Sequence, residues 1–288
     1  MILRRRIPVS EHKCNCENPL VPGIVEVIDI KDETPDVKSF FVRSIGGGLP
    51  FDVMPGQLGM VSLLPVGEGM YSVSWQEEQE YLHFAIKRVG LMTNELHRIE
   101  VGQQLGVRGP YGNGFPVEEC KGKDMLFIAG GIGLAPLRSF IKYCFKHRQD
   151  YGNIQIIYGS RSYADLCFKD ELFEKWPQEK DTEVYITIDN PEEGWNGHVG
   201  FVPAYLEEIN PAAEGKIAVV CGPPVMIKFV LQSLEKMGYT DEQVISTLEM
   251  RMKCGIGKCG RCNVGSQYIC LDGPVFTLAQ LKRLPPEW

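Results

Sequence analysis

Short apolar runs separated by turn residues occupy the first third of the chain. Runs of this length and spacing are typical of β-strands, and many short strands in succession favour an antiparallel sandwich or barrel. One helix is predicted among them over 93–99, with Thr93 as its N-terminal cap and Glu95 in its first turn. The predicted strands cover residues 24–30, 37–43, 58–64, 81–87 and 103–108.

The pattern changes after Gly122. A continuous apolar run over 125–129 is followed by apolar residues at helical spacing from Leu137 to Phe145, which predicts a strand and then a helix. Strands that alternate with helices indicate a parallel sheet covered by helices. The other predicted elements of this sheet are strands over 154–158, 184–188 and 217–220 and a helix over 224–237.

Length and composition divide the chain into parts. Its 288 residues are long for one compact domain, and the segment after Gly238 is rich in glycine and cysteine but poor in apolar residues. The expected parts are an N-terminal segment over 1–20, an antiparallel β-barrel over 21–117, an α/β parallel-sheet domain over 118–238 and a small C-terminal domain over 239–288.

Charge and hydropathy exclude several classes of partner. The net charge of −7 gives no basic surplus for a phosphate backbone, so we expect no nucleic-acid partner. No apolar run approaches the roughly 20 residues that span a bilayer, so we expect no direct membrane insertion. Arginines at 4–6 are followed by Pro8 and polar residues, not by the apolar stretch of an export signal. We therefore expect a cytoplasmic protein with reduced thiols.

Four of the ten cysteines lie close together near the C-terminus. Cys254, Cys259, Cys262 and Cys270 follow the C-x4-C-x2-C…C order of plant-type [2Fe–2S] sites. Glycines between them let the backbone wrap around inorganic sulfurs and point N–H groups at them. The alternative is a structural zinc site with four thiolates, which the spacing disfavours because zinc ribbons usually pair two C-x2-C halves.

Two further cysteines, Cys14 and Cys16, form a C-x-C pair near the N-terminus. They are either metal ligands shared with a partner subunit or free thiols in a mobile terminus. We favour free thiols, because chain termini are usually poorly ordered.

A glycine-rich turn over 130–133 joins the predicted strand 125–129 to the helix after it. Such a turn lets the backbone approach a pyrophosphate, and Pro136 suits the first turn of the helix. The next strand leads into Ser160 and Arg161, where NAD sites usually carry an acidic residue. Arg161 is either a ligand for the 2′-phosphate of NADP(H) or an exposed arginine, and the sequence favours neither.

Five further motifs follow one another along the chain. They are 55–57 (PGQ), 71–74 (YSVS), 89–93 (VGLMT), 109–115 (GPYGNGF) and 221–226 (CGPPVM). Together with the glycine turn and the cysteines, they make the chain resemble the ferredoxin–NADP reductase superfamily from about Pro22 to its end. Within it, the chain looks most like the branch of the dihydroorotate dehydrogenase electron-transfer subunit and the sulfhydrogenase-type NiFe hydrogenase gamma subunit.

The resemblance implies an FAD-binding barrel, an NAD(P)-binding α/β domain and a [2Fe–2S] domain whose metal ligands are the four clustered cysteines. It implies that Ser72 and Cys221 are the catalytic residues, beside the flavin and the nicotinamide. The usual arginine of the flavin motif is Gly69 in this chain, so we expect Lys87 or Arg88 to replace it. The expected cofactor-binding residues are Tyr71, Ser72, Val73, Ser74, Lys87, Arg88, Gly90, Thr93, Gly112, Asn113, Gly114, Phe115, Gly130, Gly131, Gly133, Pro136, Ser160, Arg161, Gly222, Pro223 and Met226.

These expectations define an electron-transfer subunit of a multi-subunit oxidoreductase. NAD(P)H gives a hydride to the flavin, and electrons then pass singly to the cluster and on to an iron–sulfur or hydrogenase partner subunit. One alternative is the flavin subunit of an electron-bifurcating transhydrogenase or of a heterodisulfide-reductase-linked complex. The other, from a different class, is a zinc-stapled nucleotide-binding protein without redox function.

Overall fold

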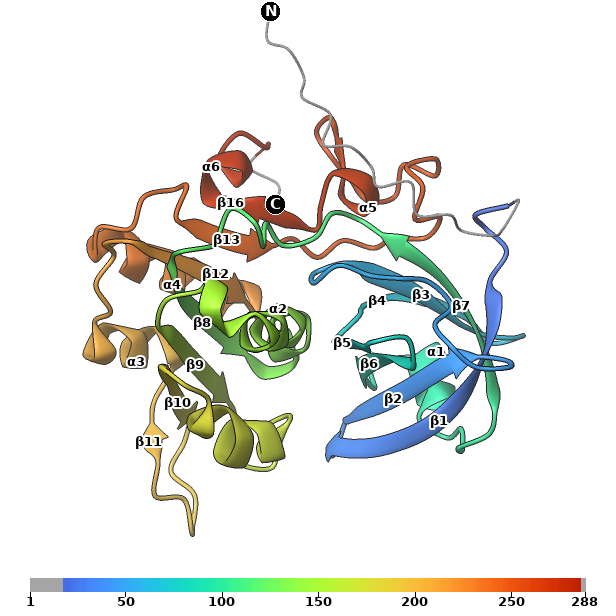
Figure 1. The fold of residues 1–288 in the computed structure, drawn as a ribbon, viewed down its shortest axis with the longest axis horizontal. Helices are drawn as coiled ribbons and strands as arrows, with labels where there is room; N and C mark the ends of the chain where they lie inside the picture. The colour runs from blue at the N-terminus through green and yellow to red at the C-terminus, as the bar shows by residue number, and fades with distance from the viewer. Residues whose placement is uncertain (1–17, 286–288) are drawn as a thin grey trace, which may run out of the picture.

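The computed structural model describes residues 18–285, which form a β-barrel, an α/β domain and a C-terminal segment that touches both (Figure 1). Cys14 and Cys16 lie outside the described residues. Among residues 18–285, none of the helices has both the length and the apolar character that crossing a bilayer requires.

The first domain is a seven-stranded antiparallel sheet in the order β4-β3-β7-β1-β2-β6-β5 (Figure 1). Alternate residues of its strands point inward, and Val27, Phe40, Leu82 and Phe84 are fully buried in its core. This confirms the expected antiparallel architecture. Its strands are β1 (Gly23–Thr34), β2 (Val37–Ser44), β3 (Leu58–Leu63), β4 (Gly67–Ser72), β5 (Trp75–Glu77), β6 (Tyr81–Lys87) and β7 (Gln104–Tyr111).

The helix of this domain differs from the prediction. Helix α1 spans Leu91–Leu96, and Gly90, not Thr93, is its N-terminal cap. Thr93 lies one turn inside, where its hydroxyl accepts hydrogen bonds from the backbone N–H groups of Val89 and Gly90 at 2.9 and 3.0 Å. From the third helical position, the Thr93 hydroxyl thus binds backbone N–H groups at the start of the helix.

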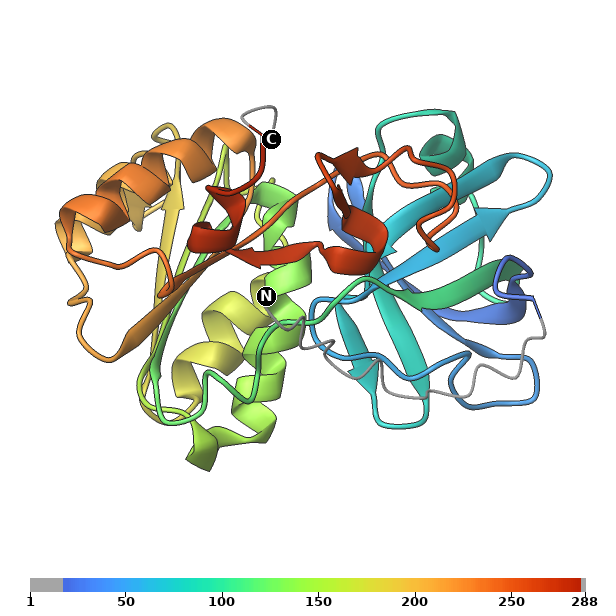
Figure 2. The ribbon, with the colours of Figure 1, turned by 90° about the horizontal axis from the view of Figure 1, so that it is seen from above.

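The α/β domain is a seven-stranded sheet in the order β11-β10-β9-β8-β12-β13-β16, parallel except at β16. Helix α2 (Leu134–Lys146) covers the face toward the barrel, and α3 (Val202–Ile209) and α4 (Pro224–Lys236) cover the other face (Figure 2). This confirms the predicted helix-covered parallel sheet. The first five strands in sequence are β8 (Asp124–Gly130), β9 (Ile154–Ser160), β10 (Thr182–Ile188), β11 (His198–Val199) and β12 (Lys216–Cys221).

The C-terminal segment crosses between the domains. Strands β13 (Val244–Thr247) and β16 (Val275–Thr277) extend the α/β sheet, with Ile245 opposite Thr277. The chain between them runs out to the barrel and returns (Figure 2), and it carries the clustered cysteines. Its short elements, and the helix after β16, are β14 (Asn263–Val264), β15 (Gln267–Tyr268), α5 (Ile269–Asp272) and α6 (Leu278–Leu281).

Candidate functional site

A cavity of about 880 Å³ lies at the carboxyl ends of β8, β9 and β12. This edge is where parallel sheets of this kind bind ligands. The glycine turn and the loop after β12 approach each other closely, because a Cβ on Gly133 would lie 2.6 Å from the carbonyl oxygen of Cys221. Pro136 lies in the first turn of α2 behind the cavity. The expected residues that line the cavity are Lys87, Gly130, Gly131, Gly133, Ser160, Arg161, Gly222, Pro223 and Met226.

The barrel forms part of the same cavity. Thr34, Asp36 and Val37 line it beside Lys87, whose ammonium pairs with the Asp36 carboxylate at 3.3 Å. The backbone N–H of Arg88 donates to the Asp36 carbonyl at 2.7 Å. The cavity therefore lies where the two domains meet.

Of two expected site residues, Arg161 lines the cavity and Cys221 does not. Arg161 is exposed and pairs with Asp165 at 3.0 Å. Cys221 is buried at the end of β12, and the Thr247 hydroxyl donates to its sulfur at 3.0 Å. Burial raises the pKa of the Cys221 thiol to about 12, so this thiol is neutral at physiological pH.

The YSVS motif divides into an accessible half and a buried half. Tyr71 and Ser72 are half-buried on β4, and the Tyr71 hydroxyl donates to the Met92 sulfur of α1 at 3.5 Å. Burial raises the pKa of Tyr71 to about 12. Val73 and Ser74 are buried, and the Ser74 hydroxyl accepts the Ala85 N–H at 3.3 Å. Only Tyr71 and Ser72 of this motif therefore offer surface to a ligand.

Gly69 has a steric explanation. A Cβ at this position would lie 2.7 Å from the Cζ atom of Tyr71, so the tyrosine ring occupies the space of a side chain at residue 69. Near α1, a Cβ on Gly90 would meet no atom within 4 Å, which leaves open space in front of the helix.

Residues 112–115 contact other parts of the protein. The N–H of Gly112 donates to the Cys270 carbonyl at 3.0 Å, and the Asn113 side chain bonds to the backbone of Val275. Gly114 packs on Met54, and Phe115 stacks on Phe140 of α2 with ring centroids 5.1 Å apart. The structure places this motif at the joint between barrel, α2 and cysteine segment, whereas the cavity is lined by other residues.

The four clustered thiols lie in two pairs. Cys259 lies close enough to Cys254 to affect the pKa of its thiol, and Cys262 lies equally close to Cys270 in this sense. Among residues 18–285, no three Cys, His, Asp or Glu side chains converge closely enough to hold one metal ion. Two thiol pairs match the chemistry of a [2Fe–2S] cluster, in which each iron takes two thiolates.

Backbone N–H groups point at these sulfurs. Burial alone raises the pKa of Cys254, but the N–H groups of Cys259, Ile256 and Lys258, 3.3 to 3.5 Å from its sulfur, lower the pKa to about 6. The Gly257 N–H donates to the Cys270 sulfur at 3.3 Å. Donors aimed at sulfur stabilise thiolates, the form that binds metal, so the segment fits an iron–sulfur cluster.

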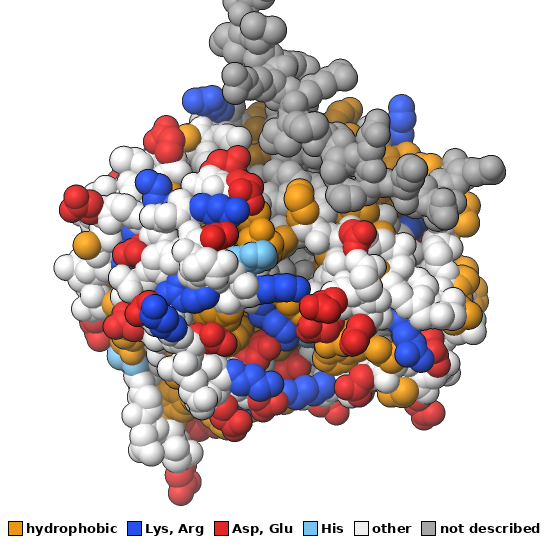
Figure 3. Space-filling view, viewed as in Figure 1, with side chains coloured by type: hydrophobic (Ala, Val, Ile, Leu, Met, Phe, Trp, Pro, Cys, Tyr) orange, Lys and Arg blue, Asp and Glu red, His pale blue; other side chains and the backbone are white. Residues whose placement is uncertain are grey.

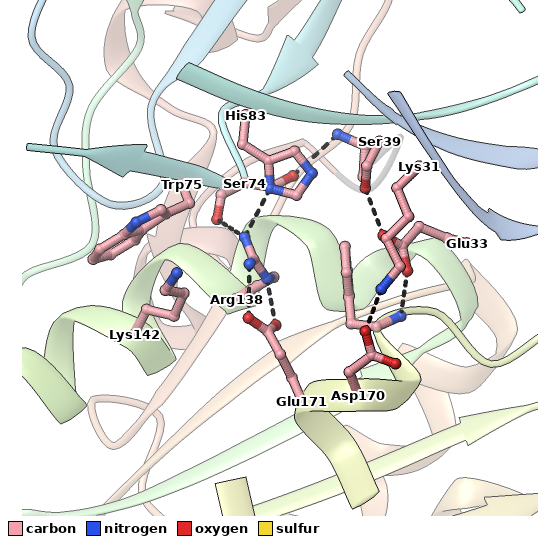
Figure 4. Close-up of polar contacts among 12 residues, drawn as sticks. Lys31, Glu33, Ser39, Ser74, Trp75, His83, Arg138, Lys142, Asp170 and Glu171 are labelled. Carbon is pink, nitrogen blue, oxygen red and sulfur yellow. Dashed lines mark hydrogen bonds and ion pairs between the residues drawn. The ribbon is translucent and has the colours of Figure 1, made fainter. Parts of the chain in front are cut away.

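A buried polar network joins the barrel to α2 (Figure 4). Arg138 donates to both carboxylate oxygens of Glu171 at 2.5 and 2.7 Å, to Nδ1 of His83 at 2.8 Å and to the Ser74 carbonyl at 3.4 Å. Burial first, and the Arg138 charge second, hold the pKa of His83 well below its ordinary value. The imidazole is therefore neutral and accepts the guanidinium N–H.

Further contacts cross the same seam. The Glu33 carboxylate accepts a hydrogen bond from the Ser39 hydroxyl of the same barrel at 2.8 Å, and one from the Phe168 N–H of the α/β domain at 2.9 Å. Lys31 pairs with Asp170 at 2.6 Å. The contacts of Glu33 and Lys31 hold the two domains in one orientation. Across this face of the molecule, basic and acidic side chains lie interspersed (Figure 3).

Sequence reasoning missed Arg138 and its partners. The available signal was local, because Arg138 is charged yet lies beside Leu137 on the helix face that is otherwise apolar. A charged residue at such a position indicates a buried ion pair, but the partner Glu171 lies 33 residues away in the chain.

Comparison with protein families agrees with this geometry. Residues 127–232 match the oxidoreductase NAD-binding domain, and residues 249–282 match the iron–sulfur cluster binding domain of dihydroorotate dehydrogenase B. The first match contains the glycine turn and the second contains all four clustered cysteines.

Similar proteins extend over almost the whole chain. Sulfhydrogenase 1 subunit gamma of Pyrococcus furiosus is 37% identical over 278 residues, which cover 93% of this chain and 95% of that protein. A probable electron-transfer subunit of dihydroorotate dehydrogenase B (NAD(+)) from Thermococcus kodakarensis is 35% identical, over 88% of this chain and 95% of its own length. In fold, a structure of an NADH-dependent reduced ferredoxin-NADP oxidoreductase aligns with a TM-score of 0.74 at 24% identity, covering 91% of this chain and 89% of that one. The chain therefore belongs to the oxidoreductase family formed by the sulfhydrogenase gamma subunits and the electron-transfer subunits of dihydroorotate dehydrogenase B.

Proposed function

We propose that this chain is the electron-transfer subunit of a multi-subunit oxidoreductase, and that it oxidises NAD(P)H through FAD and a [2Fe–2S] cluster. The observation that carries the proposal is the arrangement of the four thiols as two neighbouring pairs, with N–H donors aimed at Cys254 and Cys270. A cluster of this type accepts one electron at a time, so the chain needs a donor and an acceptor for single electrons.

The cavity between the domains supports NAD(P)H as the donor. Its glycine turn offers backbone N–H groups to a pyrophosphate at the start of α2, and Gly131 has room for a ligand because a Cβ there would meet no atom within 4 Å. Cys221, whose thiol is neutral and buried, precedes Gly222 of the cavity lining, so we place it behind the nicotinamide site.

The face of β4 beside α1 supports a bound flavin. Tyr71 and Ser72 would contact the ring system, and the open space at Gly90 would admit the phosphates. When bound, FAD supplies the step that turns a two-electron hydride into single electrons. The protein contributes by orienting the nucleotide against the flavin, since the network around Arg138 fixes the two domains against each other.

The cluster segment also supports a partner subunit. Cys259 is exposed, whereas Cys262 and Cys270 are buried, so electrons would leave beside Cys259. The relatives are subunits of larger enzymes, and we propose a hydrogenase-type or other iron–sulfur partner for this chain in the cytoplasm.

The test is the visible spectrum of anaerobically purified protein, with flavin, iron, acid-labile sulfide and zinc assayed on the same sample. We expect flavin bands, about two irons and two sulfides per chain, and bleaching by NADH or NADPH. Colourless protein that carries zinc and ignores both nucleotides would contradict the proposal. Bleaching by one nucleotide alone would identify the physiological donor.

A further inference from the structure

Arg108 of β7 lies between the barrel and the cysteine segment. Its side chain is 5% exposed. The guanidinium donates to the carbonyl oxygens of Lys253 at 2.9 Å and Cys254 at 2.8 Å, and to the Tyr111 hydroxyl at 2.7 Å. These bonds reach directly to the first cysteine ligand and the residue before it.

The turn at Cys254 is held from a second side as well. The Tyr111 ring packs against Gly255, where a Cβ would lie 2.7 Å from the ring, and Gly255 has a φ of +77°. Only glycine adopts that backbone conformation without strain and leaves room for the ring. Arg108 and Tyr111 therefore fix the position of the Cys254 turn on the barrel.

Arg108 also brings a buried positive charge to this turn. An arginine side chain stays protonated in proteins. Its carboxylate partner is Glu68 of β4, with both oxygens 3.2 Å from the guanidinium. Glu68 is 43% exposed, so water screens its charge more than that of the buried Arg108. Of the two charges in this pair, that of Arg108 is therefore the less screened at Cys254.

We propose that Arg108 is a positioning residue for the cluster, that it raises the reduction potential of the cluster, and that Glu68 lowers it. A reduced cluster carries one more negative charge than an oxidised one, so a positive group nearby stabilises the reduced form. Because Glu68 belongs to β4, the strand of Tyr71 and Ser72, the same pair ties the cluster turn to the strand on which we place the flavin. The inference rests on the proposed function in that it requires a [2Fe–2S] cluster.

The test is a redox titration of the full chain, monitored by the EPR signal of the reduced cluster. Relative to wild type, we expect R108Q to shift the midpoint to a more negative potential and R108K to shift it less in that direction. We expect E68Q to shift it to a more positive potential. Arg43 and Glu26 form a similar pair on β1 and β2, so R43Q is the control and should leave the midpoint unchanged.

A midpoint for R108Q equal to that of wild type would overturn the inference. So would a more positive midpoint, which would indicate that water enters a loosened turn and outweighs the lost charge. If R108Q loses its cluster, E68Q decides alone, because it keeps Arg108 and predicts a shift of the opposite sign. A wild-type chain with no [2Fe–2S] signal would instead refute the proposed function itself, before any variant is compared.

Discussion

The side-chain amide of Asn113 exchanges two hydrogen bonds with the backbone of Val275. Nδ2 donates to the Val275 carbonyl at 2.7 Å, and the Val275 N–H donates to Oδ1 at 2.9 Å. Asn113 follows the last barrel strand and Val275 begins β16 of the α/β sheet. One side chain thus joins the two domains at the return of the cysteine segment.

Replacement of Asn113 by alanine should destabilise this joint. Val275 is buried, so N113A leaves its N–H and C=O without partners, and we expect a loss of about 1–3 kcal/mol in the free energy of unfolding. Urea unfolding measures this loss. The exposed Asn263 of the same segment provides the control, since N263A should change the free energy by less than about 0.5 kcal/mol. Equal stability of the two variants would argue against a joint at Asn113.

Replacement of Arg138 should slow hydride transfer more than it weakens nucleotide binding. R138M removes the link between α2 and the barrel, and small misplacement of reacting groups costs up to about 100-fold in rate. Stopped-flow bleaching of the flavin over a range of NAD(P)H concentrations separates the two effects. R138K should recover part of the rate.

Arg148 is the matched control for Arg138. It lies just beyond the opposite end of α2 and donates to the carbonyls of Lys180 and Tyr151 within the α/β domain. R148M should leave the hydride-transfer rate close to that of wild type. If both methionine variants slow the reaction equally, the effect reflects general destabilisation and not the contact with the barrel.

His83 should lower the free energy of unfolding as the pH falls below about 6.5. Because its folded-state pKa is well below the ordinary value of about 6.5, the unfolded chain binds a proton below that pH while the folded chain does not. The contribution of His83 is therefore complete above about pH 6.5 and declines as the pH falls, by up to about 1.4 kcal/mol per pH unit. H83N keeps an acceptor for Arg138 but does not titrate. The difference in unfolding free energy between wild type and H83N should thus shift against wild type below pH 6.5, and a constant difference would refute this.

Positive surface charge beside Cys259 should speed electron transfer to anionic acceptors over cationic ones. Lys258 and Arg261 are exposed next to this cysteine. The reduced cluster should therefore react faster with ferricyanide, an anion, at low salt than at high salt. We expect R261E to slow the low-salt reaction several-fold and to accelerate that with hexaammineruthenium(III), a cation. The exposed Lys123, outside this segment, gives the control K123E, and an equal response of K123E and R261E would exclude a local effect.

Local signals in the sequence predicted most of the fold. Strand 81–87 is a short run of mostly apolar residues and was predicted to the residue, and the parallel strands were predicted from their continuous apolar runs. Strand β4 was missed because its residues, GEGMYS, are half-buried at a sheet edge and show no apolar alternation. Strand β13 was missed because the glycines and cysteines after it dominated the interpretation of that region.

Some residues of the candidate site were likewise predictable from local sequence and others were not. The four cysteines that we expect to be ligands are close in sequence, so their spacing alone predicted a cluster. Arg108 could not be found like this, because its partner Cys254 is 146 residues away and nothing near Arg108 in the chain indicates that contact. The roles of Gly112 and Asn113 in binding a cofactor stay predictions, and their observed partners are Cys270 and Val275.

Strand β16 also protects the edge of the α/β sheet against aggregation. It is three residues long, and it pairs with β13, which otherwise would present a row of free N–H and C=O groups to other molecules. Chains shortened before Val275 by proteolysis or incomplete synthesis would expose that row as a template for intermolecular strand addition. Residues 275–277 therefore protect the protein against aggregation, and only a chain that includes the whole cysteine segment acquires that protection.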